Sequence, residues 1–204
     1  VNLLVMDTEV YSNTGGQASK ATPRGAVAKF AADGKKTGKK NLGLMMSTYS
    51  NAYVASVNLG MDRDQTARAI VEAEQHDGPS LIIAYSPCIA HGYSMQLSKK
   101  QSERASKSGY WPMYRINPEN EKKGEPVFTW DSPNVDGDFQ KYVEEEIRYR
   151  SLMRANPEEA ERLIKLARED NAQRFSSILS IGGGATEESD EQEEQELVNA
   201  ESNE

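Results

Sequence analysis

The chain has 204 residues, of which 37% are hydrophobic, and it carries a formal net charge of −8. No stretch approaches the roughly 18 consecutive apolar residues of a membrane-spanning helix, so we expect a soluble protein. Nine acidic residues from Glu187 onward account for the net charge, because the other 23 acidic residues are balanced by 24 basic ones. This near-neutral body, with no aromatic platform among its lysines, argues against nucleic-acid binding.

Residues 1–6 form an apolar run that predicts a strand, and its near-continuous hydrophobicity favours a sheet covered on both faces. Small polar residues and two glycines follow at once, at positions 7–16. Such a loop after a buried strand is typical of α/β proteins that bind a phosphate or a metal at the carboxyl end of the strand. Because Val1 already lies inside the predicted strand, we expect the chain to be a fragment of a larger protein.

The following segments alternate between helical and strand patterns. Thr22 and Pro23 resemble an N-cap followed by proline at the first helical position, which predicts a helix ending near Gly34. The further segments are a short apolar run at 42–46, an Ala- and Val-rich run at 51–59, a helix at 64–73 and a clear strand at 80–85 that leads into Cys88. This alternation predicts parallel βαβ units, that is, an α/β fold with a parallel sheet flanked by helices.

The pattern changes after residue 110. Extended runs are predicted at 110–116 and 128–132, and an amphipathic segment at 139–152. Asn156 and Pro157 then predict the start of a long helix, after which glycines 182–184 end the ordered part. We therefore divide the chain into an α/β domain (1–116), a C-terminal extended and helical region (117–181) and an acidic tail (182–204). The tail has too little apolar surface to fold, so we expect it to be disordered, as a solvated extension or a docking segment.

Four stretches carry a resemblance to a known family. DTEVYSNTGGQASKATPRGAVAKFAADGKKTGKK, GPSLIIAYSPCIAHG, GYWPMYRINP and FQKYVEEEIRYRSLMRANPEEAERL occur in this order. They resemble the carboxyl-terminal thiamine-diphosphate-binding domain of pyruvate:ferredoxin (flavodoxin) oxidoreductases, from residue 1 to about 175. The family implies oxidative decarboxylation of pyruvate to acetyl-CoA and CO₂, with electrons passed through iron–sulfur clusters.

The resemblance also implies roles for the loop after the first strand. The Thr8 hydroxyl and the Val10 carbonyl correspond to Mg²⁺ ligands, and oxygen ligands suit this ion. The aspartate that completes the family's metal site lies in an upstream Gly-Asp-Gly turn, which this chain lacks. Asn13 corresponds to a catalytic side chain that orients cofactor or substrate, and Ser12 and Thr14 flank it in the cofactor-binding loop. From the residues alone, the loop is instead a polar turn in which Asp7 or Thr8 caps the loop.

Cys88 is the single cysteine, so the chain contains no internal disulfide. From the residues alone it is a small buried hydrophobic residue at a strand end. The resemblance instead implies the fourth ligand of a [4Fe–4S] cluster, with three cysteines upstream. Such a cluster indicates a reducing compartment, the cytoplasm or a reducing organelle of an anaerobic eukaryote. His91 either shapes the cluster environment or completes the loop, and His76 is expected at the solvated surface.

The implied partners are pyruvate, coenzyme A, ferredoxin or flavodoxin, the remaining domains of the parent enzyme and a second copy in a homodimer. A basic block either attracts a phosphorylated ligand such as coenzyme A or forms a solvated loop; it comprises Lys20, Arg24, Lys29, Lys35, Lys36, Lys39 and Lys40. Two alternatives remain. The parent enzyme acts on another 2-oxoacid or has a different electron acceptor, or the chain is a non-catalytic fragment that only packs against partners.

Overall fold

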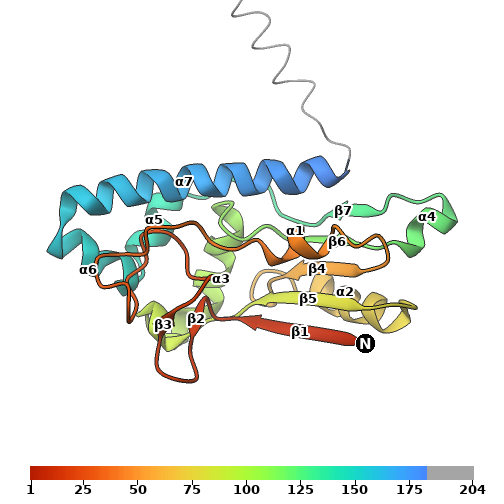
Figure 1. Ribbon diagram of the computed structural model, residues 1–204, viewed down its shortest axis with the longest axis horizontal. Coiled ribbons are helices and arrows are strands. Elements are labelled where there is room, and N and C mark those ends of the chain that lie inside the picture. The colour runs from red at the N-terminus through yellow and green to blue at the C-terminus, as the bar shows by residue number, and fades with distance from the viewer. Residues whose placement is uncertain (183–204) are drawn as a thin grey trace, which may run out of the picture.

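The computed structural model describes residues 1–182. Five strands form one sheet in the order β1-β5-β4-β6-β7 (Figure 1). β1, β5 and β4 run parallel, whereas β6 and β7 are each antiparallel to the preceding strand in this order. A separate two-stranded hairpin of β2 and β3 follows β1. The strands are β1 (Asn2–Asp7), β2 (Val10–Tyr11), β3 (Gln17–Ala18), β4 (Tyr53–Val57), β5 (Ser80–Tyr85), β6 (Tyr114–Ile116) and β7 (Phe128–Trp130).

Seven α-helices and three short 3₁₀ helices are found within residues 1–182 and flank the sheet. The α-helices are α1 (Leu42–Met46), α2 (Arg63–Gln75), α3 (Ser98–Lys107), α4 (Glu119–Lys123), α5 (Phe139–Glu144), α6 (Ile147–Ala155) and α7 (Pro157–Leu179). The 3₁₀ helices are η1 (Ile89–His91), η2 (Met95–Leu97) and η3 (Ser180–Gly182). The α/β fold class is thus confirmed, with an antiparallel extension at the β6–β7 edge.

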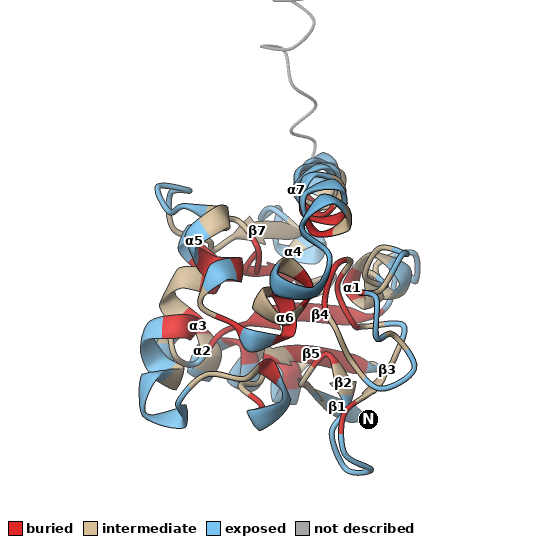
Figure 2. Ribbon diagram, turned by 90° about the vertical axis from the view of Figure 1, so that its left-hand side faces the viewer, coloured by how far each residue is buried: buried red, intermediate tan, exposed pale blue. Residues whose placement is uncertain are grey.

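The central strands are covered on both faces because their side chains alternate between two cores. Ile82 of β5 packs with β4 and α2. Leu81, Ile83 and Tyr85 of the same strand pack on the opposite side, in a larger core that includes residues of α3, α5, α6 and α7. The buried residues accordingly lie between the sheet and the helices (Figure 2).

The predicted start of the long C-terminal helix is confirmed. The Asn156 side chain accepts a 3.2 Å hydrogen bond from the Glu159 backbone N–H, and Pro157 is the first residue of α7. The amphipathic segment before it forms two helices, because the chain breaks between α5 and α6 where the fully buried Glu146 turns inward.

The helix predicted from Thr22 and Pro23 to near Gly34 is wrong, because this segment is an irregular loop. Gly25 and Phe30 have φ angles of +81° and +65°, which an α-helix does not allow. Its backbone groups bond to distant segments; for example, the Val27 N–H donates to the Arg148 carbonyl at 2.7 Å. Tertiary hydrogen bonds therefore override the cap-and-proline pattern.

Among residues 1–182 the first strand is not covered on both faces, unlike the sheet that its sequence predicts. β1 lies at the edge of the sheet and pairs only with β5. Leu3, Leu4 and Met6 are each more than half exposed, while Val5 packs against the larger core. An apolar run therefore identified the strand correctly but not its place in the sheet.

Two further expectations concern the limits of the chain's regions. The predicted division between residues 116 and 117 stays a proposal. The strands on either side of it, β6 and β7, pair in the same sheet. The predicted disordered tail lies outside the described residues, apart from Gly182. Within residues 1–182, no helix combines the length and hydrophobicity required to cross a membrane.

Candidate functional site

The loop after β1 and the turn after β5 leave the sheet side by side. β1 and β5 are parallel neighbours, with Asp7 opposite Tyr85. The Ser86 backbone N–H donates to the Asp7 carbonyl at 3.1 Å just beyond the paired residues. The polar loop and the turn that carries Cys88 therefore start at the same carboxyl edge of the sheet, where α/β proteins place their ligand sites.

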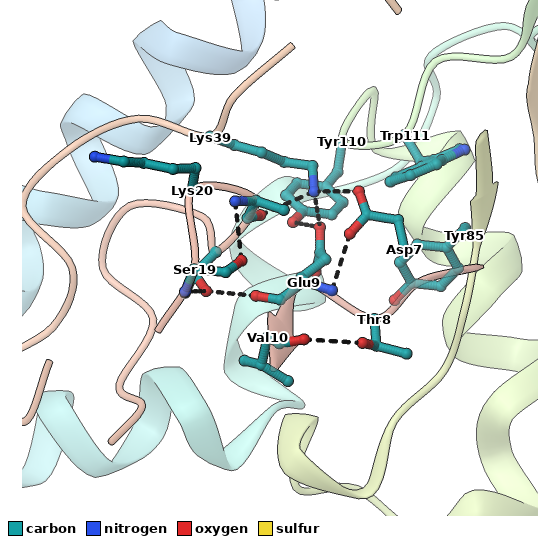
Figure 3. A network of polar contacts seen from close by, with 12 residues as sticks. Asp7, Thr8, Glu9, Val10, Ser19, Lys20, Lys39, Tyr85, Tyr110 and Trp111 are labelled. Carbon is teal, nitrogen blue, oxygen red and sulfur yellow. Dashed lines mark hydrogen bonds and ion pairs between the residues drawn. The ribbon is translucent and has the colours of Figure 1, made fainter. Parts of the chain in front are cut away.

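Three oxygen atoms of the predicted site lie together in this loop. The Thr8 hydroxyl donates a hydrogen bond to the Val10 carbonyl oxygen, with Oγ1 3.1 Å from that oxygen (Figure 3), and Oγ1 also lies 3.2 Å from Ser12 Oγ, within hydrogen-bond distance. Adjacent ligands of an octahedral Mg²⁺, each about 2.1 Å from the ion, lie about 3.0 Å apart. The separation of Thr8 Oγ1 and the Val10 oxygen therefore fits two neighbouring positions around one such ion.

Asn13 and Thr14 occupy the exposed tip of the hairpin between β2 and β3. Thr14 Oγ1 donates to Gln17 Oε1 at 2.6 Å, which ties the tip to β3. Gly16 has a φ of +91°, and a Cβ built there would lie 3.6 Å from the Ala90 Cβ, so this loop passes close to the turn that follows Cys88. The structure thus places Asn13 and Thr14 on the same loop as Thr8, but at its solvent-facing end.

The carboxylates beside Thr8 are engaged elsewhere. Lys39 Nζ contacts Asp7 Oδ2 at 2.6 Å, the Ala21 carbonyl at 2.9 Å and Glu9 Oε1 at 3.2 Å (Figure 3). These three acceptors match the three donors of its ammonium group. Among residues 1–182 no group of three His, Cys, Asp or Glu side chains converges as a metal site. Beside Thr8 the loop therefore presents hydroxyl and carbonyl oxygens, while its neighbouring carboxylates face Lys39.

Glu9 is the centre of a buried cluster of charges, which we call the Glu9 cluster: Glu9, Lys39, Tyr110, Glu146 and Arg148. The Glu9 side chain is fully buried, and its Oε2 lies 2.8 Å from Arg148 Nη1. Neither atom of this pair makes an aligned hydrogen bond, so their attraction is electrostatic. Tyr110 donates its hydroxyl hydrogen to Glu9 Oε1.

The pKa values of the two carboxylates in the cluster are shifted in opposite directions. Burial by itself raises the pKa of Glu9, but the charges of Lys39 and Arg148 outweigh it and hold this pKa well below its usual range. Burial raises the pKa of Glu146, although Arg148 Nε donates to it at 2.6 Å. Gln101 also donates to Glu146, at 3.1 Å. Glu9 is thus the more strongly stabilised anion of the two.

The turn after β5 contacts the loop through His91. Cys88 is 9% exposed, and its Sγ accepts a 3.4 Å hydrogen bond from the Ala90 N–H as η1 begins. His91, at the end of η1, places its Nε2 3.0 Å from the Thr8 carbonyl oxygen. Burial, and next the charge of Arg148, lower the His91 pKa to about 4. The imidazole is therefore neutral at pH 7 and donates from Nε2, which links the Cys88 turn to Thr8.

Most of the basic block has partners inside the protein. Arg24 pairs with Asp170, Lys36 with Glu159 and Lys39 with Asp7, while the Lys35 ammonium donates to three backbone carbonyls. These cations fix the irregular loop in place. The block is therefore neither a free anion-binding patch nor a wholly solvated loop.

Sequence analysis missed Glu9 and Arg148 altogether and misplaced His76. The His76 side chain is only 2% exposed, and its Nε2 lies 2.9 Å from the Asn51 carbonyl, contrary to the predicted solvated position. Glu9 stands between the two predicted metal ligands, which was the one available indication. Arg148 lies 139 positions further along the chain, and no local pattern relates it to this loop.

Comparison with known proteins gives one consistent result. No protein-family model matches the chain. It is 50% identical over 184 residues to the pyruvate:ferredoxin oxidoreductase of Moorella thermoacetica. It is 48% identical over 185 residues to the pyruvate-flavodoxin oxidoreductase of Klebsiella pneumoniae. Each match covers 90% of this chain and 16% of the relative. A mitochondrial pyruvate dehydrogenase [NADP(+)] of Euglena gracilis is 47% identical over 173 residues, which is 84% of this chain and 10% of that protein. The chain therefore spans no more than 16% of the length of these curated relatives.

The Glu9 cluster generates a prediction about stability. Arg148→Met should lower the free energy of unfolding by about 3–5 kcal/mol, because it leaves two carboxylates buried without their shared cation. The control is Arg162→Met, which breaks an exposed pair with Glu159 and should cost less than about 1 kcal/mol. Urea unfolding of the 204-residue chain, followed by circular dichroism, measures both. Equal losses in the two variants would contradict a stabilising role for the cluster.

Proposed function

We propose a function from the premise that this chain is homologous to one segment of the pyruvate:ferredoxin (flavodoxin) oxidoreductases, as its sequence indicates. In this proposal the parent protein converts pyruvate and coenzyme A to acetyl-CoA and CO₂, and ferredoxin or flavodoxin receives the electrons. This chain helps to bind Mg²⁺–thiamine diphosphate. The observation that supports its role is that the Thr8 hydroxyl and the Val10 carbonyl, joined by a 3.1 Å hydrogen bond, place two oxygens side by side at the carboxyl end of β1.

The proposed roles follow the geometry of the loop. Thr8 and Val10 provide two oxygen ligands to Mg²⁺, and Ser12, whose hydroxyl lies 3.2 Å from that of Thr8, borders the same position. Asn13 and Thr14, at the exposed tip, reach toward cofactor and substrate. When bound, thiamine diphosphate supplies the electron sink for decarboxylation. The protein's own part is to hold the cofactor and to orient the substrate.

Cys88 is proposed as one thiolate ligand of a [4Fe–4S] cluster. Support comes from its place after β5, at the sheet edge that also carries Thr8, and from the His91 contact between the two segments. A cluster there would lie beside the cofactor from which electrons leave. The chain has one cysteine, so the other ligands come from outside this sequence.

The remaining parts of the parent protein are the proposed partners of the exposed β1 edge. Its apolar side chains, Leu3, Leu4 and Met6, are more than half exposed, and proteins normally cover or interrupt such an edge. From the resemblance alone, we also propose that the parent protein forms a homodimer. On the same ground we place it in a reducing compartment, either the cytoplasm or a reducing organelle of an anaerobic eukaryote.

Each of two rival functions can be tested by its own experiment. The first rival is a parent enzyme that uses a different electron acceptor or another 2-oxoacid, and the Euglena relative, which is named for NADP(+), favours testing it. Turnover of the parent enzyme, measured with a panel of electron acceptors and a panel of 2-oxoacids, decides between the two functions. The second rival is a fragment that only packs against partners. The 204 residues alone lack a carboxylate at the metal position and three cluster ligands, so we expect no pyruvate-dependent dye reduction from them; such activity would contradict this proposal.

The metal role is tested by Thr8→Val in the complete parent enzyme. The variant keeps the side chain's shape but removes one oxygen ligand, so Mg²⁺-dependent affinity for thiamine diphosphate should fall by about tenfold or more. Calorimetric titration measures it. The control is Thr66→Val, which removes a hydroxyl that donates to the carbonyl of Asp62, the N-cap residue of α2, and it should leave the affinity unchanged. Unchanged affinity in Thr8→Val would exclude the ligand role.

The cluster role is tested by Cys88→Ala in the same enzyme. Loss of one thiolate should change the iron content or the reduction potential of the nearest cluster, while cofactor affinity persists because Thr8 and Val10 are intact. Electron paramagnetic resonance of the reduced variant and calorimetry with thiamine diphosphate provide the two readouts. A full set of cluster signals with normal ferredoxin reduction would show that Cys88 is only a packing residue.

A further inference from the structure

Glu9 has a backbone conformation that its residue type disfavours. Its φ is +62°, in the left-handed region, where a side chain other than that of glycine is uncommon. Only one other non-glycine residue among residues 1–182, Phe30, has a positive φ. Such a conformation persists only where surrounding contacts hold it.

Contacts on both the main chain and the side chain hold Glu9. Its N–H donates to Asp7 Oδ1 at 2.9 Å, and its carbonyl accepts a hydrogen bond from the Thr22 hydroxyl. Its carboxylate lies between Lys39, at 3.2 Å, and Arg148, at 2.8 Å. The carboxylate is therefore drawn into the protein by charges from two distant segments.

The side chain of Glu9 points away from the oxygen pair beside it. Figure 3 shows the Glu9 carboxylate directed toward Lys39 and Tyr110, while Thr8 and Val10 lie on the other side of the backbone. The left-handed residue between them turns the chain so that the Thr8 hydroxyl reaches the Val10 carbonyl and donates a 3.1 Å hydrogen bond to it. If the anchor were lost, residue 9 would relax toward a negative φ and the two oxygens would separate.

We infer that Glu9 is a positioning residue, whose buried carboxylate holds the Thr8–Val10 oxygen pair at the spacing of an octahedral Mg²⁺ site. This inference rests on the proposed function of Thr8 and Val10, and adds to it a residue that touches neither ion nor cofactor. Support from groups outside the ligand set is a general feature of metal sites.

The role implies a dependence on the kind of metal ion. Mg²⁺ requires near-ideal octahedral geometry at 2.0–2.1 Å, whereas Ca²⁺ accepts irregular geometry at 2.3–2.6 Å. A disturbed oxygen pair should therefore weaken binding with Mg²⁺ more than with Ca²⁺. A general loss of folded protein instead lowers the number of binding sites and leaves the ratio of the two affinities unchanged.

The experiment is calorimetric titration of the complete parent enzyme with thiamine diphosphate, once with Mg²⁺ and once with Ca²⁺. Glu9→Gln keeps the side chain's size and removes its charge; the Mg²⁺-supported affinity should fall about tenfold, and the ratio of Mg²⁺- to Ca²⁺-supported affinity should fall with it. The control is Glu72→Gln, which removes a carboxylate that pairs with Arg115 and lies outside the Glu9 cluster. Its ratio should equal that of the unmodified enzyme.

Equal ratios in the two glutamine variants would overturn the inference. If Glu9→Gln does not fold, Tyr110→Phe removes one hydrogen bond to Glu9 without changing any charge. It should lower the same ratio by a smaller factor, and an unchanged ratio would then overturn the inference. Thr8→Val, titrated in parallel, separates the two claims. An effect of Thr8→Val without one of Glu9→Gln rejects only the role of Glu9, whereas no effect of Thr8→Val rejects the proposed metal site itself.

Discussion

One buried carboxylate between two cations fixes the backbone of the candidate site. The Glu9 carboxylate is fully buried and is neutralised by Lys39 and Arg148. Removing one member of such a group is costly, because the remaining charges stay buried without partners. The same carboxylate holds residue 9 in a left-handed conformation, and this conformation brings the two oxygens of Thr8 and Val10 together. Stability of the core and geometry of the loop thus depend on one interaction.

The cluster also explains why a loop site requires the whole fold. Lys39 comes from the irregular segment before α1, and Arg148 from α6, so the loop after β1 reaches its geometry only when both have docked. The irregular segment is itself held by its basic residues, which pair with Asp7, Glu159 and Asp170. His91 adds a second constraint, because its imidazole joins the Cys88 turn to the Thr8 carbonyl. Two segments proposed to hold different cofactors therefore share one rigid base.

Patterns that depend on near neighbours were predictable from the sequence, and those that depend on distant ones were not. The Asn156–Pro157 helix start and the strand at 80–85 follow from local sequence patterns, and the structure contains both. The helix predicted from Thr22 to near Gly34 is wrong because N–H groups of this segment bond to distant carbonyls, such as that of Arg148. Burial of His76 and the charges around Glu9 likewise arise only from tertiary contacts. The resemblance to a family identified the predicted ligands, but not what holds them.

A crystal structure of the complete parent enzyme with thiamine diphosphate and Mg²⁺ tests the central claim most directly. The account predicts an ion bound to both Thr8 Oγ1 and the Val10 carbonyl oxygen at about 2.1 Å, with Glu9 still left-handed and still between Lys39 and Arg148. An ion that binds neither oxygen, or a Glu9 carboxylate that leaves the cluster to coordinate the metal itself, would contradict it.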